Sequence, residues 1–442
     1  MAKVFRRFRP YDATSVLSVF LLLLFAVPSS QVFVPLGSAG SPAQLLGLLM
    51  LAAWTYYQVQ RPSPTRAGHQ PVRWAFFIVV ACFTASFVVA MNRPIASAES
   101  SVAITGMVSL CGWAGLLLTA NDGIDSWPRF LTLVRRMVFG ASCVAALGIV
   151  QFATGQLWIN RLWFPGLNPN PNQPLTTLVV RNGLIRPPGT ALHPIEFGAV
   201  VTMALPMALT LAVQDRSRGV VRRWAPALLL GMGAVLCGSR SAILSGAVGL
   251  VILFACWSGP LRRRALVGVV AFTGLIALAV PGMLGALYNL FMGISTDNSA
   301  ASRTGSYPLA ETFIRHSPLF GRGFSTFLPS YRVLDNGWLG LAIEVGLAGF
   351  TAFLALILTG MWAGQRVRWA ADGDELIAQV GQALTAGIAA GAAGLAFYDG
   401  MSFPMGATMI FLLLGMAGGL RRLMLTPSRD PAVQGASAEP AR

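Results

Sequence analysis

Carboxylates stand at the start of, and inside, one apolar run, VLDNGWLGLAIEVGLAG (residues 333–349). Asp335 or Asn336 can cap the membrane helix predicted to begin there, because both side chains accept hydrogen bonds from helix N–H groups. Glu344 follows about 12 Å further along, at 1.5 Å per residue. A carboxylate inside a membrane span costs at least ~2.5 kcal/mol unless it faces a partner or water, so we expect Glu344 to face the bundle interior. Its structural role there would be to pair with a helix-end donor or with an arginine such as Arg240.

The segment LIRPPGTALHPIEFGAVV combines an arginine, a histidine and a carboxylate. Arg186 precedes Pro-Pro-Gly, which favours a rigid extended backbone. His193 and Pro194 are predicted to begin a helix, with Glu196 in its first turn, where the helix macrodipole favours a carboxylate as in a capping box. His193 and Glu196 therefore each have two possible roles. The first is to stabilise the start of the helix, and the second is to face an acceptor hydroxyl. For His193 the local role is the simpler interpretation.

Arg240 lies in LCGSRSAILSGAVG, between two apolar runs that are too close for a real loop. An arginine at such a turn can simply extend its head group to the membrane interface. Gly238 and Ser239 shape the turn, however, and an arginine at a membrane boundary is a functional hypothesis by default.

A third group of basic residues lies in DNSAASRTGSYPLAETFIRHSPLFGRGF. Arg303 follows a cluster of capping-type residues and is expected on a short helix. Arg322 lies in a glycine-rich turn, SPLFGRG, which is weak evidence for phosphate binding. The alternative is that several of these arginines are only solvated, and for Arg315 and Arg332 we prefer that interpretation.

The composition indicates a membrane protein. Of the 442 residues, 55% are hydrophobic and only 11% are charged, and the mean hydropathy is +0.64. Soluble domains carry about 25% charged residues. The five cysteines occur singly in apolar segments, so we expect neither a disulfide framework nor a zinc site.

Twelve apolar runs are long enough for membrane helices, since a span needs roughly 20 mainly apolar residues. The predicted spans are residues 14–34, 41–58, 74–91, 101–120, 130–153, 195–214, 224–238, 241–258, 265–284, 337–362, 377–398 and 402–420. The fold class is therefore an all-α polytopic membrane protein.

The arginines orient these spans. With the N-terminus in the cytoplasm, most of the 32 basic residues fall in inside segments, so the positive-inside rule places both termini in the cytoplasm. This also explains the net charge of +16 without nucleic acid as a partner. The expected organisation is about five helices in residues 1–153, an outer loop at 154–194, about four helices in 195–284, an outer loop with a short helix at 285–336, about three helices in 337–420, and a disordered cytoplasmic tail at 421–442. Connections longer than ~12–15 residues are usually functional or disordered, so we place the chemistry in the two outer loops.

Four segments in this order resemble the O-antigen ligase and polymerase family. RPPGTALHPIEFGA resembles its Arg-x-x-Gly-Thr-x-x-x-Pro segment, and GSRSAILSGAVGL resembles its Ser-Arg helix start. The run from SRTGSYPLAETFIRHSPLFGRGFSTF to DNGWLGLAIEVGLAG resembles its outer loop and the helix after it. The resemblance covers residues 186–349.

The resemblance implies an integral membrane glycosyltransferase that takes glycan from a polyprenyl-pyrophosphate donor, outside the bacterial cytoplasmic membrane, without a metal or other cofactor. A glycan or lipid would be the acceptor. Arg186, Arg240 and Arg303 would match the arginines that hold the donor pyrophosphate, and Arg322 is a fourth candidate. Guanidinium groups suit this role because they give bidentate, permanently charged contacts and stabilise charge on the leaving group.

One departure concerns the acceptor. Lipopolysaccharide ligases of this family usually carry His-Asn where this chain has Asp335-Asn336. Asp335 could take the proton of the acceptor hydroxyl or only orient it, and His193, Glu196 and Glu344 are alternatives for that role. The departure favours a polymerase, or a ligase with another acceptor.

Two other classes of protein are weighed against this interpretation. A transporter or flippase of lipid-linked glycans is expected to place charges or broken helices near the bilayer midplane in corresponding halves. Here most charges cluster at the predicted outer boundary, and the sequence shows no internal repeat. A structural scaffold would not explain arginines flanked by turn residues in three places.

Overall fold

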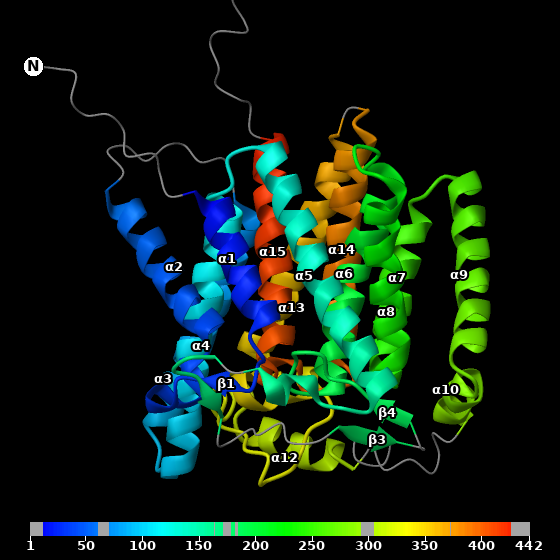
Figure 1. Cartoon of the computed structure of the whole chain (residues 1–442). Helices are drawn as coiled ribbons and strands as arrows, with labels where there is room; N and C mark the ends of the chain where they lie inside the picture. The colour runs from blue at the N-terminus through cyan, green and yellow to red at the C-terminus, as the bar shows by residue number, and fades with distance from the viewer. Residues whose placement is uncertain are drawn as a thin grey trace, which may run out of the picture.

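The computed structural model describes residues 12–60, 70–162, 164–170, 178–181, 184–292, 305–371 and 373–425. Most of them belong to helices that lie side by side in a bundle (Figure 1). The long helices are α1 (Ala13–Ala26), α2 (Pro42–Val59), α3 (Pro71–Met91), α4 (Ser97–Asp122), α5 (Trp127–Thr154), α6 (Pro194–Gln214), α7 (Val220–Leu236), α8 (Arg240–Ala255), α9 (Gly259–Ala279), α13 (Gly337–Trp369), α14 (Glu375–Leu395) and α15 (Pro404–Leu425).

Short elements gather at one end of the bundle, which we call the loop end (Figure 1). They are β1 (Gln31–Val32), β2 (Asn168–Pro169), β3 (Val179–Arg181), β4 (Leu184–Arg186), α10 (Met283–Met292) and α12 (Tyr307–His316). The strands form two antiparallel pairs, β1 with β2 and β3 with β4. The short helix predicted between residues 285 and 336 is confirmed by α12.

Among the described residues, seven helices are long and apolar enough to cross a membrane: α3, α4, α5, α6, α13, α14 and α15. The number rises to nine if two bent helix pairs each count as one span, and α1 and α8 are shorter apolar helices. A helix covers part or all of each of the twelve predicted runs. The all-α membrane class is therefore confirmed, whereas a total of twelve spans remains a prediction.

Local sequence explains where several helices begin. Proline occupies the first turn of α2, α3, α5 and α6, where its missing N–H is not needed. Ser41 caps α2 and Asp374 caps α14, each by accepting a hydrogen bond from a first-turn N–H group. These capping residues fix the ends of elements whose interiors are apolar.

Several predicted boundaries were wrong: α9 is Gly259–Ala279 where 265–284 was predicted, and α13 continues past residue 362 to Trp369. The run predicted at 14–34 is helical only to Ala26, because the chain then turns to pair with the segment before α6. The hydroxyl of Thr190 donates to the carbonyl of Phe25, and the N–H of Ser29 donates to the carbonyl of Thr190, both at 2.9 Å. At the other end, α15 continues past residue 420 to Leu425, and residues 426–442 of the predicted tail lie outside the described residues.

The core lies between the central helices. α6 is the most buried of the spanning helices and packs against α7, α8 and α14. α13 packs against α3, α14 and α15, and α15 also packs against α4. Because α6 and α13 pack directly against α8 and α15, respectively, the core fixes the relative positions of these helices and so of the side chains at their starts.

Candidate functional site

Among the helices that begin at the loop end, α6, α8, α13 and α15 are central to the bundle (Figure 1). The N–H of Gly337, the first residue of α13, donates to the carbonyl of Tyr398 in the connection from α14 to α15, at 3.1 Å. Glu196 in the first turn of α6 accepts hydrogen bonds from the first turn of α15. A helix N-terminus carries unpaired N–H groups and a partial positive charge. The partial positive charges of these N-termini therefore favour an anionic group beside them.

Two of the predicted pyrophosphate-binding arginines lie at one turn in this region. Arg186 ends β4, and its Nε–H donates to the carbonyl of Cys237 at 2.9 Å. Gly238 has a φ of +55°, and a Cβ on it would lie 3.3 Å from Cγ of Arg186. Arg240 begins α8 directly after this turn. Both arginines are buried, with 5% and 8% of their surface exposed, so two permanent positive charges lie beside the helix N-termini.

His193 caps α6, which confirms its local role. Its Nδ1 accepts a hydrogen bond from the N–H of Ile195 at 3.2 Å, which assigns the proton of the neutral ring to Nε2. Burial, together with the charge of Arg186, lowers the pKa of His193 to about 4, so the ring is neutral at pH 7. A neutral imidazole with this tautomer presents Nε2–H as a donor. The geometry therefore suits His193 to donate to a ligand and gives no support to its acting as a base.

Glu196 joins the starts of two helices. It is fully buried, and one carboxylate oxygen accepts from the N–H of Leu192 at 2.7 Å. The other oxygen accepts from the N–H groups of Met405 and Gly406, at 2.6 and 3.2 Å. The contacts of Glu196 therefore agree with its predicted local role at a helix start, because three backbone N–H groups donate to its two oxygens.

Asn336, and not Asp335, caps α13. The side-chain oxygen of Asn336 accepts from the N–H of Leu339 at 3.1 Å. Asp335 is half-buried directly before the cap, at the point where α13 meets the α14–α15 connection. The cap and the candidate proton acceptor are therefore separate residues.

The carboxylate of Glu344 accepts hydrogen bonds from the backbone of the outer loop, and not from Arg240, which the sequence suggested as one partner. Its two oxygens accept from the N–H groups of Ser325 and Phe327, at 3.0 and 3.1 Å. These donors belong to the loop before α13. The sequence prediction that Glu344 needs a partner inside the bundle is confirmed, and the partner is loop backbone.

The helix α13 is broken at Gly346, which has a φ of 62° and a ψ of −169°. The segment SPLFGRG pairs with both sides of the break. The four hydrogen bonds are Arg322 N to Ile343 O (2.9 Å), Gly323 N to Glu344 O (2.8 Å), Leu347 N to Pro318 O (2.9 Å) and Ala348 N to Leu319 O (3.1 Å). The run predicted as one continuous span at 337–362 is therefore interrupted, and the glycine-rich turn supplies the backbone partners that the helix loses there.

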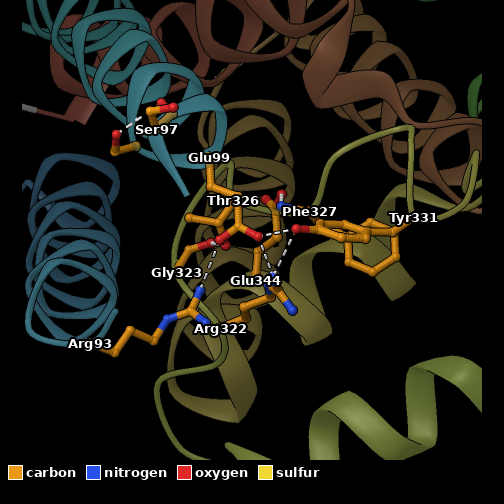
Figure 2. Close-up of polar contacts among 10 residues, drawn as sticks. Arg93, Ser97, Glu99, Arg322, Gly323, Thr326, Phe327, Tyr331 and Glu344 are labelled. Atoms are coloured by element: carbon orange, nitrogen blue, oxygen red, sulfur yellow. Dashed lines mark hydrogen bonds and ion pairs between the residues drawn. The ribbon is translucent and has the colours of Figure 1, made fainter. Parts of the chain in front are cut away.

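The side chain of Arg322 is engaged by the protein itself. It forms an ion pair with Glu99 in the first turn of α4, and the two side chains are 18% and 4% exposed. Its guanidinium lies 4.7 Å from the ring centroid of Tyr331, whose hydroxyl also bonds Glu99 (Figure 2). Arg93 lies 3.5 Å from the second oxygen of the same carboxylate. These contacts hold the outer loop against α4. They also occupy the guanidinium of Arg322, whereas Arg186 lies at the turn before α8.

Replacing Glu99 with glutamine is expected to loosen this loop. Hydrogen bonds to charged groups contribute about 1.5–3 kcal/mol each, and the change removes the charge that pairs two arginines. We expect a loss of stability of about 2 kcal/mol, measured as a lower melting temperature in detergent, and faster proteolysis within residues 317–332. Glu311→Gln removes a carboxylate whose ion pair is exposed and serves as the control. Equal protease sensitivity of the two variants would contradict this role of Glu99.

One predicted residue, Arg303, lies outside the described residues, and the structure adds others. Sequence reasoning missed Glu99, because the acid in SAES precedes the span predicted at 101–120. It also placed Tyr398 inside the span predicted at 377–398. In the structure α14 ends at Leu395, and Tyr398 lies in the connection between the starts of α13 and α15.

Residues 225–354 match the family model described as O-antigen ligase. This segment contains Arg240, the Glu99-bound Arg322, Asp335 and Glu344, so the family resemblance inferred from the motifs is confirmed there. No curated protein matches the chain. The chain is therefore a helical membrane protein in which residues 225–354 are similar to the O-antigen ligase family.

Proposed function

We propose that this protein transfers or polymerises glycan from a polyprenyl-pyrophosphate-linked donor at the outer face of the bacterial cytoplasmic membrane. The observation that carries the proposal is the pair Arg186 and Arg240, buried together where four helix N-termini converge. Guanidinium groups and helix N-termini both favour phosphate oxygens. The excess of arginines in the opposite segments supports placing the loop end outside.

In the proposed reaction, the oxygen of an acceptor hydroxyl attacks the anomeric carbon of the donor glycan. The bond from that carbon to the pyrophosphate breaks, and the hydroxyl proton passes to Asp335. Arg186 and Arg240 stabilise the negative charge that develops on the leaving polyprenyl pyrophosphate. Because these arginines supply the positive charge, we propose that the reaction needs no divalent cation.

The other candidate residues take supporting roles in this proposal. His193 donates a hydrogen bond from Nε2, while Glu196 and Glu344 hold the helix starts and the loop through the backbone contacts described above. Arg322 positions the loop through Glu99. Arg303 is proposed as a further pyrophosphate contact from the family resemblance.

The test is transfer by the purified protein in proteoliposomes that contain a polyprenyl-pyrophosphate glycan and a glycan acceptor. The expected products are a longer glycan, or a glycan on the acceptor, together with free polyprenyl pyrophosphate, with unchanged yield in EDTA. Movement of intact donor across the membrane without a new glycosidic bond would indicate a transporter instead and overturn the proposal.

Asp335→Asn is expected to lower turnover by at least about 100-fold, because general bases contribute roughly 10²–10⁴-fold. The fold should survive, because Asn336 caps α13 and stays in place. Turnover and melting temperature are measured together. Turnover close to that of the unchanged protein would mean that Asp335 only orients the acceptor.

A further inference from the structure

Tyr398 lies inside the convergence of helix starts. It belongs to the connection between α14 and α15, it is 2% exposed, and its carbonyl accepts from the first N–H of α13. Its ring centroid lies 5.7 Å from that of Phe403, which lies 6.1 Å from the ring of His193. Tyr398 is thus placed between Asp335, which precedes α13, and the residues that begin α6.

The hydroxyl of Tyr398 is buried and has no hydrogen-bond partner among the described residues. Two glycines lie against it: a Cβ on Gly400 would be 3.2 Å from this oxygen, and a Cβ on Gly406 would be 3.3 Å from it. A buried hydroxyl without a partner costs its desolvation, and phenylalanine would fill the same space without that cost. An unpaired polar group of this kind in a native protein is a candidate for a functional contact.

The charges around this hydroxyl indicate what it would contact. Burial and the neighbouring carboxylates of Glu196 and Asp399 raise the pKa of Tyr398, so the phenol is protonated at neutral pH. Carboxylates beside the phenol disfavour a phosphate oxygen at this point. A sugar hydroxyl is neutral, can accept from the phenol and can donate to a carboxylate. The half-buried ring of Phe403 beside Tyr398 offers apolar surface to a sugar ring.

We propose that Tyr398 binds the acceptor glycan through its hydroxyl and presents the attacking sugar hydroxyl to Asp335. This inference rests on the proposed function, because it divides the site into a donor part at Arg186 and Arg240 and an acceptor part at Tyr398. The donor pyrophosphate lies toward the arginines, and the acceptor sugar lies toward the α14–α15 connection.

The experiment uses Tyr398→Phe in the full-length protein, with Tyr56→Phe as a matched control, since Tyr56 on α2 is 66% exposed. For Tyr398→Phe we expect an unchanged or higher melting temperature. We also expect kcat/KM for the acceptor to fall about tenfold, as for the loss of one hydrogen bond, with KM for the lipid-linked donor unchanged. The control should match the unchanged protein in all three quantities.

Three results would overturn the inference: a lower melting temperature, which indicates a structural hydroxyl; an unchanged kcat/KM for the acceptor; or a raised KM for the donor, which indicates a phosphate contact. The proposed function fails in a different way. If the unchanged protein makes no glycosidic bond, or if Arg186→Ala and Arg240→Ala both transfer normally, the proposed function or its donor site is wrong whatever the behaviour of Tyr398→Phe.

Discussion

Arg240→Ala is expected to lower kcat for glycan transfer by about 10²–10³-fold, the usual effect of removing one donor from a site of developing negative charge. Arg240 is 8% exposed at the first position of α8, so its charge acts where little water screens it. Arg186→Ala is expected to have an effect of the same size. Transfer is measured with the purified protein and a polyprenyl-pyrophosphate glycan, at saturating donor concentration.

Lysine substitutions separate charge from geometry at these two positions. Lysine keeps one positive charge but loses the planar fork that binds two phosphate oxygens at once. Arg240→Lys should therefore retain more activity than Arg240→Ala and still fall below the unchanged protein. Arg186 also donates to the carbonyl of Cys237, so its alanine variant is expected to lose stability as well, and its melting temperature must be reported beside its kcat.

Arg315→Ala is the matched control for this experiment. Arg315 also lies at the loop end, on α12, but its side chain is 79% exposed and pairs only with Glu311 on the same helix in the ion pairs that the structure describes. An exposed pair contributes little, so turnover should not change. Normal kcat in both Arg186→Ala and Arg240→Ala would show that these arginines do not hold the donor.

Sequence alone locates features that depend on neighbouring residues. The twelve apolar runs mark the helices because a membrane span must be apolar over its whole length. Asn336 and the His193–Pro194 pair mark helix starts because capping is a contact within one turn. That Arg186 and Arg240 serve one site was implied only by the family resemblance.

The contacts that sequence could not show join distant parts of the chain. Arg322 pairs with Glu99, 223 residues away, and Glu196 bonds the backbone of Met405, 209 residues away. No periodicity links such positions. The break in α13 was also hidden, because glycine is common in membrane helices, and so Gly346 within an apolar run resembles an ordinary helical residue.

Gly321→Ala is expected to be the most damaging single change in the outer loop. Gly321 has a φ of +70°, and a Cβ there would lie 2.3 Å from the carbonyl oxygen of Glu344, which is backbone and cannot turn away. The clash would force the loop off the break in α13 and expose the carbonyls of Ile343 and Glu344, which now accept from the loop. Strained backbone costs about 1–3 kcal/mol and each unpaired buried carbonyl a similar amount, so we expect a loss of at least about 3 kcal/mol.

Gly282→Ala separates the clash from the backbone strain. Gly282 has a φ of +83°, but nothing lies within 4 Å of the position that its Cβ would take. Its alanine variant should therefore show only the conformational cost, about 1 kcal/mol. The melting temperature of Gly321→Ala should fall well below that of Gly282→Ala, and proteolysis within residues 317–332 should rise only in the former. Equal melting temperatures of the two variants would mean that the stability of the loop does not depend on its close contact with the break in α13. In that case, Asp335 would be positioned by α13 alone.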